Sequence, residues 1–140
     1  MLGGIMARVY RTTDKISVKI DDITVKISPL SYEQKSVIQS LLISGDPLSV
    51  VKAAKESIRY AVKEVSGVED SDGSVYELMF DEGVLSDSCI DDLLNIDPED
   101  KLSLVCTSLL NGIPKGFVDP QTGKPIDGIT IERPKSGKKA

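Results

Sequence analysis

The chain has 140 residues, of which 40% are hydrophobic and 28% charged, and its 22 acidic and 17 basic residues give a net charge of −5. This composition is ordinary for a soluble globular domain. Histidine is absent, which removes the most common general base and the most common metal ligand. No apolar run approaches the ~18 residues that a transmembrane helix needs, and the first residues lack the apolar segment of a signal peptide. We therefore expect a cytoplasmic protein without a membrane segment.

The first regular structure is predicted as a hairpin over residues 16–27. Two short runs in it alternate apolar and polar residues, with Asp21-Asp22 between them. Period-two alternation on both sides of a turn is typical of two antiparallel strands with one buried face. The apolar positions of the two runs are Ile16, Val18, Ile20, Ile23, Val25 and Ile27.

Two helices are predicted after this hairpin. Ser31 and Gln34 have the spacing of a capping box, in which each side chain binds a free backbone amide at the helix start. Gly45 is expected to end this helix. Asp46-Pro47 then predicts the start of a second helix, because aspartate is a good N-cap and proline is tolerated in the first turn.

A second hairpin is predicted from residues 58–65 and 75–80, which also alternate apolar and polar residues. Asp72-Gly73 lies between them, and glycine readily adopts the positive φ that such a turn needs. The apolar residues of 53–65 also recur at spacings of three and four, so a longer second helix remains an alternative. We favour the strand because β-branched and aromatic residues gather in this stretch.

Two more helices are predicted in the second half of the chain. Ser86 is expected to cap the first, and Asp97-Pro98 repeats the cap-plus-proline start for the second. Gly112, which follows an asparagine, is a strong stop signal. Together these elements predict an α+β fold, with a small antiparallel sheet from two hairpins packed against about four helices.

The domain is predicted to cover residues 1–113. Residues 114–140 are rich in proline and glycine, carry a net charge of +3, and are expected to form an extended tail that adds little to the core. A chain that ends at Gly112 is then expected to melt within a few degrees of the full-length protein. The tail also has apolar residues that can add a short strand to an exposed sheet edge, on this chain or on a neighbour. They are Ile126, Ile129 and Ile131.

No motif of the sequence predicts catalysis, a cofactor or a metal. Asp70-x-Asp72-Gly73 resembles part of a calcium loop, but alignment on the glycine places Val68 and Met79 where the first and last ligands must be acidic. We therefore interpret this stretch as a solvated turn.

The two cysteines, Cys89 and Cys106, have no metal-ligand spacing and are expected to be buried thiols. Cys89 lies near a predicted helix start, where a thiolate is favoured, but the chain offers no histidine to act as its base. We therefore expect a protein that is not an enzyme.

Charge is distributed unevenly along the chain. Residues 64–100 contain thirteen acidic and no basic residues. The simplest interpretation is a solvated surface, and the alternative is a mimic of the DNA backbone that occupies a DNA-binding protein. The basic tail has no interleaved aromatic residues for stacking on bases, so nucleic-acid binding is not expected.

Three stretches of residues 23–96 together resemble small tail assembly chaperones of long-tailed, siphovirus-type bacteriophages. They are VKISPLSYEQKSVIQSLL, AVKEVSGVEDSDGSVYELMF and GVLSDSCIDDLLNI. The resemblance implies no catalytic residues. It implies a morphogenesis protein of the host cytoplasm that binds the tape-measure protein, and the tail-tube protein as a further partner.

Such a chaperone must shield apolar segments of its client, so we expect an apolar patch that the fold leaves exposed. The candidate residues lie on the apolar faces of the predicted helices: Val37, Leu41, Leu93 and Leu109. Self-association through the tail strand is a further expectation. Two other functions remain open: a structural component of the virion, such as a tail terminator, tube or head–tail connector protein, and an acidic decoy of a host DNA-binding protein.

Overall fold

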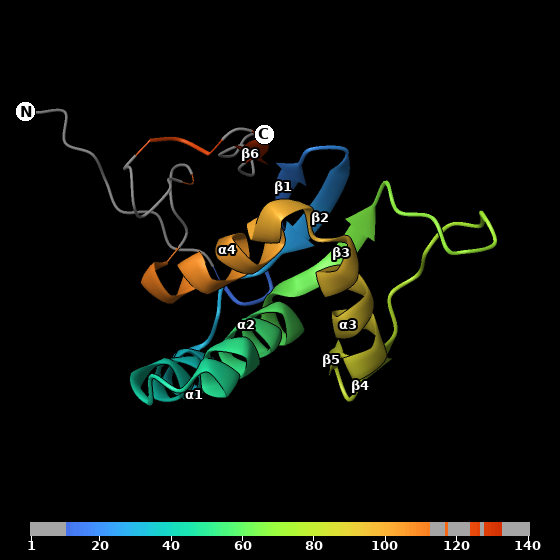
Figure 1. Ribbon diagram of the computed structural model, residues 1–140. Coiled ribbons are helices and arrows are strands. Elements are labelled where there is room, and N and C mark those ends of the chain that lie inside the picture. The colour runs from blue at the N-terminus through green and yellow to red at the C-terminus, as the bar shows by residue number, and fades with distance from the viewer. Residues whose placement is uncertain (1–10, 113–116, 118–123, 127, 133–140) are drawn as a thin grey trace, which may run out of the picture.

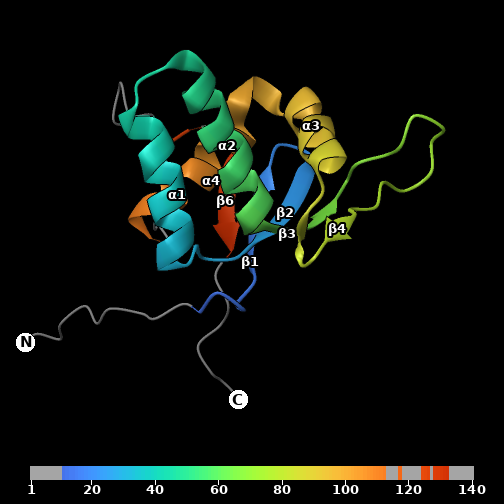
Figure 2. The ribbon, with the colours of Figure 1, turned by 90° about the horizontal axis from the view of Figure 1, so that it is seen from below.

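The computed structural model describes residues 11–112, 117, 124–126 and 128–132. Within these residues four α-helices pack against a four-stranded antiparallel sheet, and a small two-stranded sheet lies to one side (Figures 1 and 2). The α+β class predicted from the sequence is therefore confirmed. The strand order of the large sheet is β3-β2-β1-β6.

The predicted N-terminal hairpin is confirmed. β1 (Ile16–Ile20) pairs with β2 (Ile23–Ile27) in antiparallel register, so that Ile20 lies opposite Ile23. Asp21 adopts a positive φ of 52° in the turn, which an aspartate tolerates better than most residues. The alternating isoleucines and valines of β1 are fully buried beneath the helices, and Lys19 between them is exposed.

The first two helices begin where the sequence predicts. Ser31 caps α1 (Tyr32–Ile43), with its Oγ 3.1 Å from the backbone nitrogen of Gln34 and the Gln34 side chain 2.9 Å from the Ser31 nitrogen. The Asp46 carboxylate caps α2 (Pro47–Ala61) by accepting a first-turn amide at 3.3 Å. The two helices pack side by side as an αα-hairpin.

The prediction of a second hairpin is wrong for its first strand, residues 58–65. Residues 58–61 continue α2, and β3 (Val62–Ser66) pairs with β2 rather than with residues 75–80. The stretch is helical rather than extended because the helix turns Ser57, Ile58 and Ala61 into the core, where they are fully buried.

The segment that follows β3 forms a projecting loop instead of a hairpin strand. Its two sides meet at a single bridge, between Glu69 and Val75. The chain then forms the small sheet, in which β4 (Phe80–Asp81) pairs with β5 (Val84–Leu85). Gly67 starts the loop at a φ of +83°, and a Cβ there would come within 2.5 Å of the Asp22 carbonyl oxygen, so only glycine fits.

The last two helices are joined by a kink. Ser86 caps α3 (Asp87–Ile96), as predicted. A short 3₁₀ turn over Pro98–Asp100 then leads into α4 (Lys101–Ser108), and a further 3₁₀ turn, η2 (Leu109–Asn111), ends at Gly112.

Asp97 caps α4 across the kink, although it lies four residues before the helix. Its carboxylate accepts the backbone amides of Leu102 at 2.6 Å and Ser103 at 3.0 Å. We expect Asp97→Ala to lower the free energy of unfolding by about 1–2 kcal/mol, because it leaves both amides without that partner. Urea unfolding measures the loss. Asp97→Asn keeps the accepting oxygen and should lose less, so equal losses would contradict the capping role.

Part of the predicted C-terminal tail belongs to the sheet. β6 (Ile129–Glu132) pairs antiparallel with β1 at the sheet edge, which selects this chain from the two possibilities that the sequence left open. Phe117 is only 6% exposed and contacts the core. The prediction that residues after 113 add little to the core is therefore wrong for Phe117 and β6.

Candidate functional site

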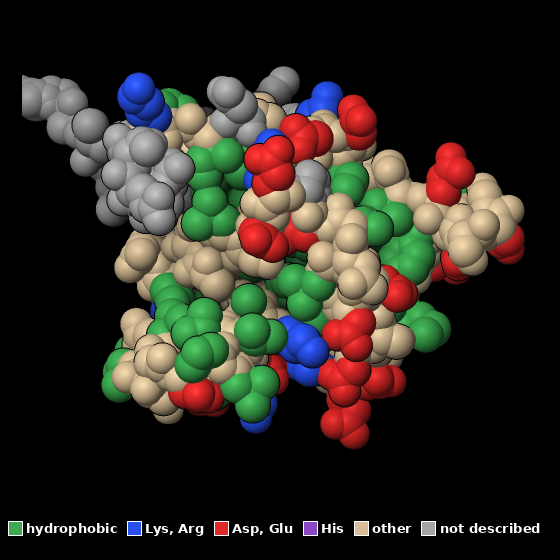
Figure 3. All heavy atoms as spheres, viewed as in Figure 1, with side chains coloured by type: hydrophobic (Ala, Val, Ile, Leu, Met, Phe, Trp, Pro, Cys, Tyr) green, Lys and Arg blue, Asp and Glu red, His purple; other side chains and the backbone are tan. Residues whose placement is uncertain are grey.

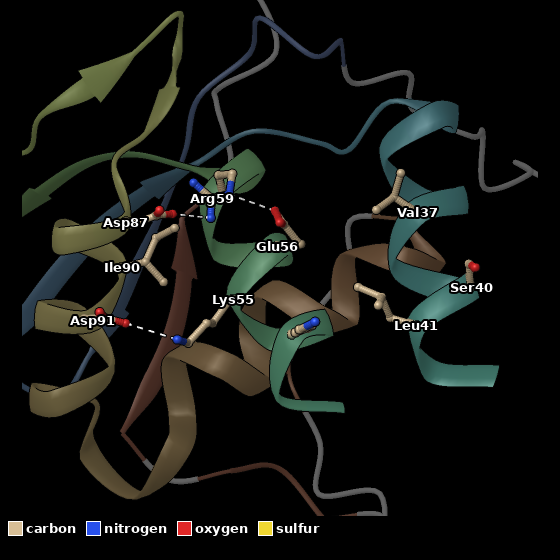
Figure 4. Close-up of a pocket in the computed structure, with 10 residues that line it drawn as sticks. Val37, Ser40, Leu41, Lys55, Glu56, Arg59, Asp87, Ile90 and Asp91 are labelled. Carbon is tan, nitrogen blue, oxygen red and sulfur yellow. Dashed lines mark hydrogen bonds and ion pairs between the residues drawn. The ribbon is translucent and has the colours of Figure 1, made fainter. Parts of the chain in front are cut away.

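A groove of about 740 Å³ runs between three helices of the described structure. Its floor is one face of α2, its apolar wall comes from α1, and its opposite wall comes from the start of α3 (Figure 4). Val37 and Leu41, two of the residues that the sequence singles out for partner binding, line the α1 wall. They lie four residues apart and therefore share a face of the helix.

The α1 wall is apolar and open to solvent. Val37 is 45% exposed, and Leu41 is half-buried with part of its side chain against the core. Of the eleven large hydrophobic residues that are exposed among the described residues, seven lie on α1 and α2, and of these seven Val37 lines the groove. Figure 3 shows apolar side chains gathered over these helices, at the lower left. A concentration of this kind is typical of a surface that another molecule covers.

Arg59, on the floor of the groove, forms hydrogen bonds that connect α2 with the start of α3. Its guanidinium donates to Glu56 at 2.8 Å, to Asp87, and to the Leu85 carbonyl oxygen at 3.2 Å. Burial alone would lower the pKa of Arg59, but the bonds to Asp87 and Glu56 raise it above the ordinary value. The guanidinium is therefore a fixed positive charge that holds α2 and α3 together.

A second ion pair crosses the groove one helical turn further along. Lys55 lies 3.2 Å from Asp91, so the basic pair Lys55 and Arg59 on α2 faces the acidic pair Asp87 and Asp91 on α3. Lys52 continues the basic row, and no ion pair to it is observed within the described residues. Lys55 and Arg59 are thus already paired with acidic residues, while Val37 and Leu41 leave apolar surface open on the other wall.

Other residues of the acidic run also have partners inside the molecule. Glu64 lies 2.8 Å from Lys15, and a hydrogen bond from that lysine holds the pKa of Glu64 below its ordinary value. The Tyr76 hydroxyl donates to Asp92 at 2.8 Å. These pairs fit a structural and solvated role for this part of the run.

Two of the predicted partner-binding residues lie elsewhere. Leu93 and Leu109 are each 1% exposed and belong to the hydrophobic core, so the expectation that they contribute to an exposed patch is wrong. Leu93 occupies the buried face of α3, and Leu109 lies just after α4. The three tail isoleucines, Ile126, Ile129 and Ile131, are partly buried against the core.

The charged residues of the groove were not predicted from the sequence. Lys55 and Arg59, like Asp87 and Asp91, are spaced four apart within their helices. Two matched rows of opposite charge at helical spacing are a signal that can predict adjacent helices. The prediction of a strand over residues 58–65 placed Arg59 in that strand, so its helical spacing from Lys55 was not considered.

The two cysteines are free and buried. The Cys89 Sγ lies 3.2 Å from the Met79 backbone nitrogen. Burial opposes ionisation of this thiol, but hydrogen bonds with Ser86, Tyr76 and Met79 lower its pKa below the ordinary value. Burial raises the pKa of Cys106. With Cys89 only 2% exposed, its sulfur is closed to solvent-borne substrates.

The residues of the calcium-like motif make local turn contacts. The Asp70 carboxylate accepts the Ser71 amide at 2.7 Å, and Asp72 accepts the Ser74 amide at 3.0 Å. Among the residues that the structure describes, there is no group of three or more side chains placed to hold a metal ion. The same residues include no helix with the length and apolarity to cross a membrane.

Comparison of the chain with protein-family models, with curated proteins and with solved structures finds no match.

Proposed function

We propose that the protein is a non-enzymatic tail assembly chaperone of a long-tailed bacteriophage, and that its groove holds apolar segments of the tape-measure protein. It acts in the host cytoplasm and leaves before the virion is complete. The observation that carries this proposal is the uncovered apolar wall of α1, where Val37 and Leu41 border a groove of about 740 Å³. The resemblance of three sequence stretches to such chaperones supports the same function.

The shape of the groove favours a helical segment as its occupant. Its floor extends along α2 from Lys52 to Arg59, which is about 10 Å, or two helical turns. A partner helix that lies along this floor would set apolar residues spaced three or four apart against Val37 and Leu41. Polar residues on its flanks would then lie near the ion pairs of α2 and α3.

Val37→Asp is expected to reduce co-purification with the tape-measure protein of the same genome at least tenfold, because it places a carboxylate on the apolar wall. Leu41→Asp should do the same. Both proteins are expressed together, the chaperone is captured by a tag, and the bound partner is quantified. The fold is checked by circular dichroism. Val37 is the cleaner site because its side chain is already 45% exposed.

Gln39→Asp is the matched control, since it adds the same charge to the same helix at an exposed position outside the groove. It should bind like the unmodified protein. Full binding by folded Val37→Asp and Leu41→Asp variants would contradict the groove as the client site. Retention of the protein in purified particles, seen by mass spectrometry, would instead favour a structural virion component.

A further inference from the structure

The hairpin tip is an exposed apolar surface outside the groove. It is the end of the α1–α2 hairpin, and five side chains on it are between 36% and 84% exposed. They are Leu42, Ile43, Leu48, Val50 and Val51. Its charges are few, because residues 42–52 contain only Asp46, which caps α2, and Lys52. The tip therefore has an apolar surface with no net charge.

A second exposed apolar surface, the arm, is formed by residues 68–82. Val75 is 78% exposed, Met79 60% and Phe80 42%. The arm projects from the side of the molecule opposite the hairpin tip, as both ribbon views show (Figures 1 and 2). In contrast to the tip, the arm carries six acidic residues and no basic one.

Contacts of the arm with the rest of the molecule leave Val75 and Met79 exposed. Tyr76 and Leu78 turn inward and pack against the core, which leaves the alternate residues Val75 and Met79 outside. The Tyr76 amide donates to the Val68 carbonyl oxygen at 3.1 Å, and its hydroxyl is bound to Asp92. The arm therefore presents a fixed apolar surface with acidic borders.

Charge decides which surface can cover the arm. Contact between two arms is disfavoured, because it would bring together two sets of six carboxylates. The hairpin tip has the opposite character: it is apolar, carries no net charge, and has Lys52 at its border. A contact between tip and arm covers both of these surfaces with one interface.

We propose that the protein self-associates head to tail, with the hairpin tip of one copy packed on the arm of a second copy. The tip and the arm lie on opposite sides of the molecule, so two copies cannot form both contacts with each other at once, and each added copy still offers a free tip or a free arm. The assembly therefore grows beyond a dimer, either into a ring or into an open chain. Of the residues that line the groove, only Lys52 falls within residues 42–52 of the hairpin tip.

Sedimentation velocity of two variants and their mixture tests the proposal. Leu48→Asp disables the tip and Met79→Asp disables the arm, and both replace side chains that are at least 60% exposed. Between about 10 and about 500 µM, where small apolar contacts associate, the unmodified chain should form species larger than a dimer. Each variant alone should remain monomeric. Their equimolar mixture should form a dimer and stop there, because only one intact tip and one intact arm can meet.

Tyr32→Asp, at an 84% exposed position on α1 away from the tip, is the matched control and should associate like the unmodified chain. A monomeric mixture, or a monomeric unmodified chain over the whole concentration range, would overturn the proposal. Loss of association in Leu48→Asp but not in Met79→Asp would also overturn it, since that result indicates contact between two tips. Circular dichroism verifies that each variant is folded.

Discussion

Replacing Leu93 by aspartate is expected to leave most of the protein unfolded at room temperature. Leu93 is 1% exposed and, together with Ile20, Val25 and Leu102, lines an apolar space of only about 10 Å³. Such a space holds neither a partner for the carboxylate nor enough water to solvate it. The cost should exceed about 5 kcal/mol, which is the whole free energy of unfolding of a marginally stable domain. The loss of the far-ultraviolet circular dichroism signal measures it.

Ile96→Asp is the matched control for this experiment. Ile96 lies on the same helix, one turn from Leu93, but is 42% exposed. It should lower the melting temperature by only a few degrees. A folded Leu93→Asp protein with a near-normal melting temperature would show that α3 is not held as the structure describes. It would also restore Leu93 as a candidate for partner binding.

The second large effect is expected from ending the chain at Gly112. This truncation removes Phe117, which is 6% exposed, and the whole of β6, so that β1 becomes an uncovered edge strand. Loss of a buried phenylalanine alone typically costs about 3–5 kcal/mol. We expect the melting temperature to fall by more than about 10 °C, and the open edge to promote aggregation. Differential scanning calorimetry and light scattering measure the two effects.

Phe117→Ala in the full-length chain separates the two contributions. It removes the buried ring but keeps β6 on the edge of β1, so it should lower the melting temperature without promoting aggregation. A truncated protein that melts within a few degrees of the full-length chain would contradict the packing of Phe117 and β6. That outcome is the one that the sequence predicted from the proline and glycine content of the tail.

Local rules predicted the parts of the fold whose signals are local. The β1–β2 hairpin follows from strict alternation, and the starts of α1, α2 and α3 follow from Ser31, Asp46 and Ser86, whose side chains bind the first free amides. Each of these signals involves residues within a few positions of one another. Tertiary packing did not override them.

The error at residues 58–65 arose because two periodicities overlap there. Ile58, Tyr60 and Val62 alternate as in a strand, whereas Ile58 and Ala61 also lie on one helical face. The core decides between them, because it buries Ile58 and Ala61 on the inner face of α2, and the strand begins only at Val62. A sequence alone does not contain that information, since the competing partner, β2, is more than thirty positions away.

Only part of the candidate site was predicted, because the sequence does not show which helix faces another element covers. Val37 and Leu41 were found because both belong to one apolar helix face, but so does the buried Leu93 on its own helix. What separates them is whether another element covers the face. No described residue covers the α1 wall beside the groove, while residues of the sheet lie against Leu93.

The pairing of β6 with β1 also bears on synthesis of the protein. Ser17 pairs with Glu132, 115 positions later. At about 5–20 residues per second, a ribosome needs roughly 6–23 s to translate that interval. During this time the outer edge of β1 has no strand from its own chain, and neighbouring nascent chains can pair with it. Lys19, the exposed next-to-last residue of β1, places a charge on that open edge and so disfavours such mispairing.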